Sequence, residues 1–285
     1  MAKILIVGAG KLGLPLALRL HDCGHQVNAI RRSTPDTDAS GIRWHLLDLT
    51  EAGSLHQITG EFDQVIIILT PLSRTPEGYR QIFQEAINNL LQYLETRMDR
   101  PACVFVSATS VYAQDDGSWV DEDSKTSPTS YNGQSLLAAE RRILDWSPDP
   151  LIIRFAGIYG PDRRRLLSQL EKPLAIQRTP PWFTNRVHQE DCVGILDYLA
   201  ARQRDGNLGH HIGIGADNDP AATFEMMTWL AETAGLIPPD PMDAPEDAPR
   251  NKRCSNLRLQ ESGYQLIYPG YREGYAAMLC GDDSA

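Results

Sequence analysis

Short apolar runs alternate with longer segments of helical periodicity over the first half of the chain. Short, mostly apolar runs predict strands over residues 3–7, 26–30, 42–47, 64–69, 102–106 and 151–155. Between these runs, apolar side chains recur every three to four residues and predict helices, the clearest over residues 77–99 and 134–144. Strands that are buried on both faces and joined by helices are typical of parallel sheets. The pattern therefore predicts an α/β fold with a doubly wound parallel sheet.

The first strand runs directly into glycines with the spacing G-x-G-x-x-G, and a helix follows at once. In this context Gly8 permits a tight turn, Gly10 lets the backbone approach a pyrophosphate, and Gly13 lets helix and strand pack closely. The backbone N–H groups of Lys11, Leu12 and Gly13 are expected to bind the anion at the helix N-terminus. The sequence therefore predicts a dinucleotide cofactor and a sheet of the Rossmann type.

Two arginines follow the second strand, at the place where NAD-preferring proteins of this fold carry Asp or Glu. Arg31 and Arg32 suit the 2′-phosphate of NADP, because a guanidinium forms paired, charge-assisted hydrogen bonds with phosphate. A solvated basic turn is the alternative. We therefore expect NADP or NAD as cofactor, with NADP favoured.

Further cofactor-binding candidates follow the ends of other strands, since ligands of doubly wound sheets lie outside the carboxyl ends. They are Asp48, Leu49, Leu69, Thr70, Pro71 and Ser107. Asp48 also suits an ordinary helix N-cap.

The regular alternation ends near residue 162. We predict a dinucleotide-binding domain over residues 1–161, to which residues 186–214 return, and a smaller C-terminal substrate lobe over most of 162–285. In and near that lobe, Arg178 and Arg186 are candidates for holding an anionic substrate. Solvated surface arginines are the alternative.

The composition restricts which partners and which cellular location we expect for the protein. Acidic residues outnumber basic ones by 37 to 27, for a net charge of −10, which disfavours nucleic acid. Five scattered cysteines without a C-x-x-C pair indicate reduced thiols and no metal site. A core strand begins within three residues of Met1, and no apolar run approaches the roughly 20 residues of a membrane span. We therefore expect a cytoplasmic protein without membrane contact.

The apolar stripe of the helix over residues 77–99 includes Ile82, Phe83 and Met98. Such a stripe is typical of a core-facing helix. A helix of this length in this position also suits packing against a second subunit, so a homodimer through residues 77–99 is a second expectation.

With these residues assembled, the chain resembles the extended short-chain dehydrogenase/reductase group, in particular the NAD-dependent epimerase/dehydratase family. The resemblance rests on residues 8–13, 106–113, 128–140, 152–161 and 186–191. It implies an oxidoreductase or epimerase, the latter an isomerase, that acts on a nucleotide sugar or a related anionic substrate.

The chemistry of that family uses a Tyr-x-x-x-Lys pair, in which the lysine lowers the pKa of the phenol. Here Ser135 stands four residues after Tyr131, and a register shifted by one residue pairs Asn132 with Leu136, so the lysine is missing in both. The resemblance then implies Tyr131 and Thr109 as catalytic candidates.

The resemblance also places Tyr112 beside the substrate. Ordinary packing beside the cofactor is the alternative for Thr109 and Tyr112, and a partly exposed helix start is the alternative for Tyr131. Two functions stay open: an enzyme with a degraded Tyr-Lys pair, and a non-catalytic NAD(P)-binding protein with a regulatory or redox-sensing role.

Overall fold

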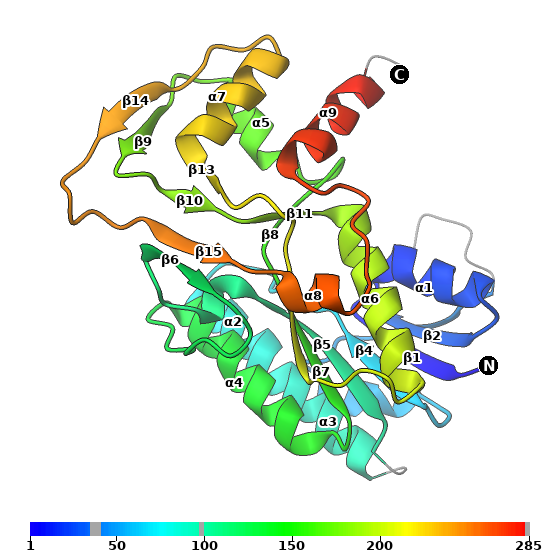
Figure 1. The fold of residues 1–285 in the computed structure, drawn as a ribbon. Helices are drawn as coiled ribbons and strands as arrows, with labels where there is room; N and C mark the ends of the chain where they lie inside the picture. The colour runs from blue at the N-terminus through cyan, green and yellow to red at the C-terminus, as the bar shows by residue number, and fades with distance from the viewer. Residues whose placement is uncertain (35–40, 97–99, 283–285) are drawn as a thin grey trace. The chain divides into compact units, whose positions relative to one another are not determined.

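The structure, a computed structural model, describes residues 1–34, 41–96 and 100–282, and its two compact units alternate along the chain (Figure 1). The first unit comprises Met1–Val111, Thr126–Arg154 and Val193–Gly213. The second unit comprises Tyr112–Lys125, Phe155–Cys192 and Ile214–Ala285. Each unit is described by itself below.

A seven-stranded sheet with the order β12-β7-β5-β4-β1-β2-β3 is formed by the described part of the chain. Its strands are β1 (Lys3–Val7), β2 (Gln26–Arg31), β3 (Arg43–Leu46), β4 (Gln64–Ile67), β5 (Ala102–Ala108), β7 (Pro150–Phe155) and β12 (Ile212–Gly215). The pairs β1–β2, β1–β4, β2–β3 and β4–β5 are parallel. Ile4 to Val7 of the central strand are fully buried, as expected for a strand covered on both faces. The predicted α/β fold with a Rossmann-type parallel sheet is confirmed.

The strand order reverses beside β1. The chain passes from β1 outward to β2 and β3 and then crosses back to β4, on the other side of β1. In sheets of this kind, the crevice at such a reversal, outside the carboxyl ends of the strands, is where ligands bind. The topology therefore directs attention to the ends of β1, β2, β3 and β4.

Helices cover both faces of this sheet (Figure 1). On one face, Arg19 of α1 (Gly13–Asp22) forms an ion pair of 2.6 Å with Asp197 of α6 (Gln189–Arg204). On the other face lie α3 (Ile87–Glu95) and α4 (Tyr131–Trp146). Short 3-10 turns, η1 (Ala52–Gln57) and η3 (Thr109–Val111), follow β3 and β5.

The predicted helix over residues 77–99 forms as three consecutive stretches. These are α2 (Pro76–Arg80), a π-helical turn η2 (Gln81–Ala86) and α3. Met98 and Asp99, which belonged to the predicted helix, lie outside the described residues. The apolar stripe faces the core, and the exposed positions are polar, among them Gln81, Gln84, Asn88 and Gln92. A dimer through this helix would therefore use a polar interface.

A buried ion pair joins α4 to the neighbouring strands of the first unit. Arg154 of β7 donates to Glu140 of α4 through Nε at 3.0 Å and Nη2 at 2.7 Å. The hydroxyl of Ser107 in β5 donates to the same carboxylate at 2.6 Å. Three elements distant in sequence are thus fixed by one carboxylate.

Short strand pairs and helices form the second unit. Its strands are β6 (Asp116–Val120), β8 (Gly157–Tyr159), β9 (Ala175–Thr179), β10 (Phe183–Thr184), β11 (Arg186–His188), β13 (Ala221–Ala222), β14 (Asp240–Asp243) and β15 (Asn251–Cys254). Its helices are α5 (Arg165–Leu170), α7 (Thr223–Thr233), α8 (Leu257–Glu261) and α9 (Tyr271–Asp282). The core is built on Tyr159 and Tyr275, whose rings stack 4.4 Å apart, and on Met226, Met227 and Leu230 of α7.

Within residues 1–34, 41–96 and 100–282, no helix has the length and apolar character needed to cross a bilayer. The same residues contain no cluster of three or more His, Cys, Asp or Glu side chains suited to a metal ion.

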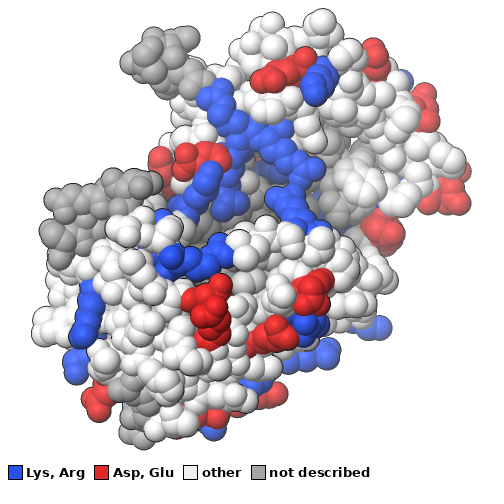
Figure 2. All heavy atoms as spheres, turned by 180° about the vertical axis from the view of Figure 1, so that it is seen from behind, with Lys and Arg blue, Asp and Glu red and all other residues white. Residues whose placement is uncertain are grey.

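The net charge of −10 does not describe every local surface, since the face in Figure 2 carries Lys and Arg side chains among its Asp and Glu residues.

Candidate functional site

The glycine turn after β1 gives each of its three glycines a different role. Gly8 has a φ of +96°, and a Cβ there would lie 2.1 Å from the carbonyl oxygen of Ile68. A Cβ on Gly13 would lie 2.4 Å from the carbonyl oxygen of Gly8. Gly10 differs, because no described atom lies within 4 Å of the position of its Cβ. Gly8 and Gly13 are therefore required by the fold itself, whereas Gly10 keeps a face of the turn open.

Hydrogen bonds hold this turn against the neighbouring strand. The N–H groups of Gly8 and Ala9 both donate to the carbonyl oxygen of Ile30, at 3.1 and 2.9 Å. The helix α1 then begins, with Leu12 as its N-cap, and this side chain makes no capping hydrogen bond. An apolar N-cap leaves the positive end of the helix dipole available to an external anion.

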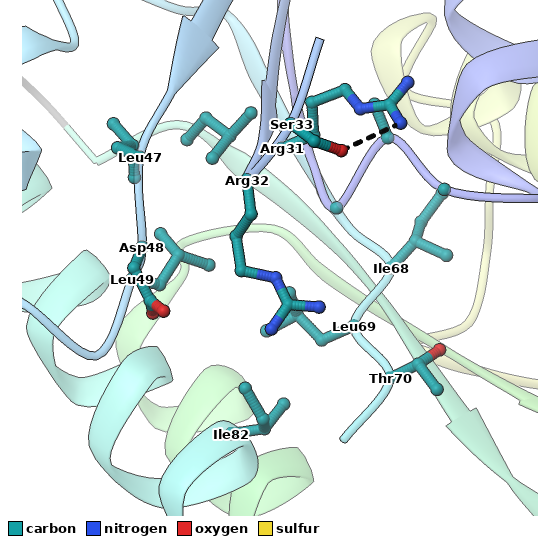
Figure 3. Close-up of a pocket in the computed structure, with 14 residues that line it drawn as sticks. Arg31, Arg32, Ser33, Leu47, Asp48, Leu49, Ile68, Leu69, Thr70 and Ile82 are labelled. Carbon is teal, nitrogen blue, oxygen red and sulfur yellow. Dashed lines mark hydrogen bonds between the residues drawn. The ribbon is translucent and has the colours of Figure 1, made fainter. Parts of the chain in front are cut away.

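A hollow of about 230 Å³ opens beside the turn, at the carboxyl ends of the first four strands of the sheet (Figure 3). Eight predicted cofactor-binding residues line it: Gly8, Gly10, Arg31, Arg32, Asp48, Leu49, Leu69 and Thr70. The hollow thus brings together side chains from four separate strand ends, at the reversal of the strand order.

Other predicted cofactor residues lie outside the lining of this hollow. Gly13 packs beneath Gly8, and the N-cap residue Leu12 is buried. Ser107 is also buried, with its hydroxyl bound to Glu140. Lys11 is exposed and Pro71 half-buried. The roles of these residues toward a cofactor stay predictions.

Six lining residues were not predicted: Ala9, Ile30, Ser33, Leu47, Ile68 and Ile82. Five of them adjoin predicted residues in the glycine turn or at strand ends, so widening each predicted segment by one residue would have found them. Ile82 comes from η2, and no local sequence pattern connects it with the hollow.

Arg31, the last residue of β2, and Arg32, which follows it, point in different directions (Figure 3). The guanidinium of Arg31 turns away, and its Nη2 lies 3.5 Å from the hydroxyl of Ser33. The guanidinium of Arg32 extends into the hollow, toward Leu69. A positive charge therefore stands inside the hollow, and it belongs to Arg32.

Asp48 faces the same hollow as an ionised carboxylate. Its Oδ1 accepts hydrogen bonds from the N–H and the hydroxyl of Thr50, at 2.9 and 2.8 Å. The backbone hydrogen bond from Thr50 is the main cause that lowers the pKa of Asp48. The carboxylate thus fixes the turn after β3, while it also lines the hollow.

Tyr131, the predicted proton carrier, is the first residue of α4 and is 40% exposed. Its hydroxyl donates to the carbonyl oxygen of Arg74 at 2.7 Å, and its ring packs edge-on against Tyr79. One turn further along α4, Ser135 is buried. Thr109, the other catalytic candidate, is half-buried in η3.

The predicted substrate residues of the second unit differ in their surroundings. Arg178 is exposed and lies 3.6 Å from Asp243, as in an ordinary surface ion pair. Tyr112 is buried. Arg186 is largely enclosed, and its buried Nε has no hydrogen-bond partner among the described residues. Burial lowers the pKa of Arg186. Arg186 therefore keeps one buried donor, its Nε, without a partner among the described residues.

The parallel sheet, the glycine turn at the strand reversal and the hollow beside it define a Rossmann-type α/β protein. The chain belongs to the family described as the RmlD substrate binding domain, whose model matches residues 2–179. The predicted membership among the epimerases/dehydratases and short-chain dehydrogenases/reductases is confirmed for the family as a whole.

Similar proteins cover nearly the whole chain. Protein YeeZ of Escherichia coli strain K12 is 29% identical, over 94% of this chain and 97% of its own length. A solved structure from Methylobacillus flagellatus, described as an NAD-dependent epimerase/dehydratase, is 33% identical, with a TM-score of 0.80 over 99% of each chain. The structure of MoeE5 in complex with UDP-glucose and NAD is 23% identical, with a TM-score of 0.78 over 99% of each chain. The similarity to MoeE5 concerns the fold alone.

Proposed function

We propose that this protein binds NADP or NAD in the hollow of the first unit. The observation that carries the proposal is the open face at Gly10, where a backbone without Cβ stands beside the helix N-terminus and Arg32. The residues present fit a dinucleotide: the glycine turn suits the pyrophosphate. We assign Asp48 and Leu49 to the adenosine, with the support that both line the same hollow. When bound, the nicotinamide would accept or donate a hydride.

We further propose that NADP is preferred. The support is Arg32, since its guanidinium enters the hollow at the end of β2, whereas Arg31 turns toward Ser33. A guanidinium binds a phosphate through paired hydrogen bonds, and the 2′-phosphate is the group by which NADP differs from NAD.

The reaction we propose is that of an oxidoreductase or epimerase on a nucleotide sugar or a related anion. Family membership supports it, as does the complex of MoeE5 with UDP-glucose and NAD. In the second unit, the Nε of Arg186, which has no partner among the described residues, suits an anionic group, with Tyr112 and Arg178 as further candidates. Tyr131 and Thr109 are the proposed proton-transfer residues.

Proton transfer by Tyr131 would require its hydroxyl to leave the carbonyl oxygen of Arg74, and no lysine stands one turn away to lower the pKa of the phenol. This observation favours a second candidate function. The protein would then bind the dinucleotide without catalysis, as a regulatory or redox-sensing protein.

The remaining expectations are proposals of the same kind. The cofactor would belong to the first unit and the substrate to the second. We also propose a cytoplasmic location. We further propose a homodimer, and size-exclusion chromatography with light scattering would test this oligomeric state.

The decisive experiment for cofactor binding compares Gly10→Ala with Gly53→Ala. Both glycines leave open space for a Cβ, and neither has a positive φ, so neither substitution strains the fold. We expect Gly10→Ala to weaken NADPH and NADH binding at least about tenfold, about 1.4 kcal/mol, and Gly53→Ala to leave it unchanged. Fluorescence titration measures the affinity, and a thermal melt verifies folding. Equal affinity in both variants, or no binding by the unmodified protein, would refute the proposal.

A further inference from the structure

A second hollow, of about 370 Å³, lies entirely within the second unit. It is lined by β6, the segment after β12, the end of β15 and α8. Its residues are distinct from those of the cofactor hollow, and nothing in the proposed function uses them. Three of its features together specify a ligand.

The first feature is Trp119 of β6, an aromatic side chain that is 55% exposed. The guanidinium of Arg253 lies 5.1 Å from the centre of the Trp119 ring and 4.8 Å from that of Phe183. Arg253 is itself fixed, because its Nε donates to the carbonyl oxygen of Gly117 at 2.8 Å. The indole is thereby held in place by one neighbour while more than half of its surface stays open.

The second feature is a linked set of side-chain amides. Asn256 donates through Nδ2 to Oδ1 of Asn218 at 2.7 Å and to the carbonyl oxygen of Ala216 at 2.9 Å. Gln260 donates through Nε2 to Oδ1 of Asn218 at 3.0 Å and to Oδ1 of Asn256 at 2.7 Å. Among the described residues, the Nδ2 of Asn218 and the Oε1 of Gln260 have no partner. The network therefore presents one donor group and one acceptor in fixed positions.

The third feature is that the residues of the lining carry little charge. Within the described part of the chain, the lining of this hollow contains no Lys, Arg or His, and its one acidic residue, Asp217, is buried. Arg253 stands outside this lining, where its guanidinium already packs on the Trp119 ring and its Nε donates to Gly117. The lining also includes two apolar residues, Pro220 and the exposed Leu257.

We propose that this hollow binds an uncharged sugar ring, free or as part of a glycan. The C–H face of the ring would pack on Trp119 and Leu257, since an indole offers a large apolar surface with little entropy to lose. Sugar hydroxyls both donate and accept hydrogen bonds, which matches the donor of Asn218 and the acceptor of Gln260. Trp119 is the one aromatic residue of the lining, so a planar base would lack a second ring to stack against.

Saturation-transfer NMR with glucose, galactose, mannose and N-acetylglucosamine tests the proposal on the full-length protein. A shallow site of this kind predicts a Kd of about 1–10 mM for at least one of them. We expect Trp119→Leu to weaken this binding at least about tenfold. Trp182→Leu serves as the matched control, because Trp182 is also a partly exposed tryptophan of the second unit but does not line the hollow.

Gln260→Leu keeps the test valid if Trp119→Leu disturbs folding, which a thermal melt would reveal. This variant removes the acceptor while leaving the indole in place, and we expect it to weaken binding severalfold. Three results would overturn the proposal: no sugar binds the folded protein, sugar binding is insensitive to both Trp119→Leu and Gln260→Leu, or adenosine or uridine competes with the sugars for a site that Trp119→Leu abolishes. Retained binding in the Trp182→Leu variant completes the expected pattern.

Discussion

The ion pair of Glu140 and Arg154 is expected to be the most costly polar contact of the first unit to break. Glu140 is 1% exposed and Arg154 is 3% exposed, and two hydrogen bonds of 2.7 and 3.0 Å join them. Glu140→Gln keeps the shape of the side chain but leaves the buried guanidinium without its counter-charge. Loss of one partner of a buried pair costs about 3–5 kcal/mol. We expect the free energy of unfolding to fall by about 3 kcal/mol, measured by urea denaturation at neutral pH.

An exposed pair supplies the control. Glu85 and Arg80 form a salt bridge at the protein surface, so Glu85→Gln is expected to change the free energy of unfolding by less than about 1 kcal/mol. The double variant Glu140→Leu with Arg154→Met removes both charges and should recover part of the loss. A decrease below about 1 kcal/mol for Glu140→Gln would refute the view that the buried charge dominates.

Three further predictions concern the sites. Arg32→Ser should weaken NADPH binding at least about tenfold and leave NADH affinity nearly unchanged, whereas equal losses for both cofactors would contradict a role at the 2′-phosphate. Tyr131→Phe should lower kcat at least about 100-fold if the phenol transfers the proton, and unchanged turnover of a nucleotide sugar would exclude that role. Burial raises the pKa of Asp217 to about 8, so the folded state holds a proton that the unfolded state loses near pH 4. Stability from this group is therefore full below about pH 4 and decreases until about pH 8, and Asp217→Asn should flatten that slope in thermal melts; an unaltered slope would contradict it.

The sheet was predictable because its strands carry their own signal. Residues 3–7 and 64–69 are apolar without alternation, and this pattern arises when both faces of a strand are covered. The π-helical turn η2 was not predictable, since the apolar spacing of residues 77–99 fits a continuous α-helix equally well. Pairings such as β6 with β15 join residues more than one hundred positions apart, and no local pattern specifies them.

The cofactor hollow was predictable to the extent that strand ends converge in a doubly wound sheet. The sequence could not distinguish Arg31 from Arg32, because adjacent residues at a strand end differ only in the direction of their side chains. The hydrogen bond from Tyr131 to Arg74 could not be predicted from the sequence either, since the acceptor is a backbone carbonyl that any residue could supply. Side-chain identity thus predicts which chemistry is available, and only the three-dimensional arrangement shows which groups are already engaged.

The position of the missing lysine in the Tyr-x-x-x-Lys pair lies on a buried part of α4. Ser135, which stands one turn after Tyr131, is only 7% exposed, and the neighbouring Leu136 and Ala139 are buried as well. A lysine in this place would have to bring its long side chain into a buried position, and a buried ammonium group left unpaired costs several kcal/mol. Because Ser135 is buried, we expect the single change Ser135→Lys to destabilise the fold rather than to restore the usual pair. Any proton transfer by Tyr131 must therefore use a source of activation other than a lysine at this position, and dinucleotide binding does not depend on it.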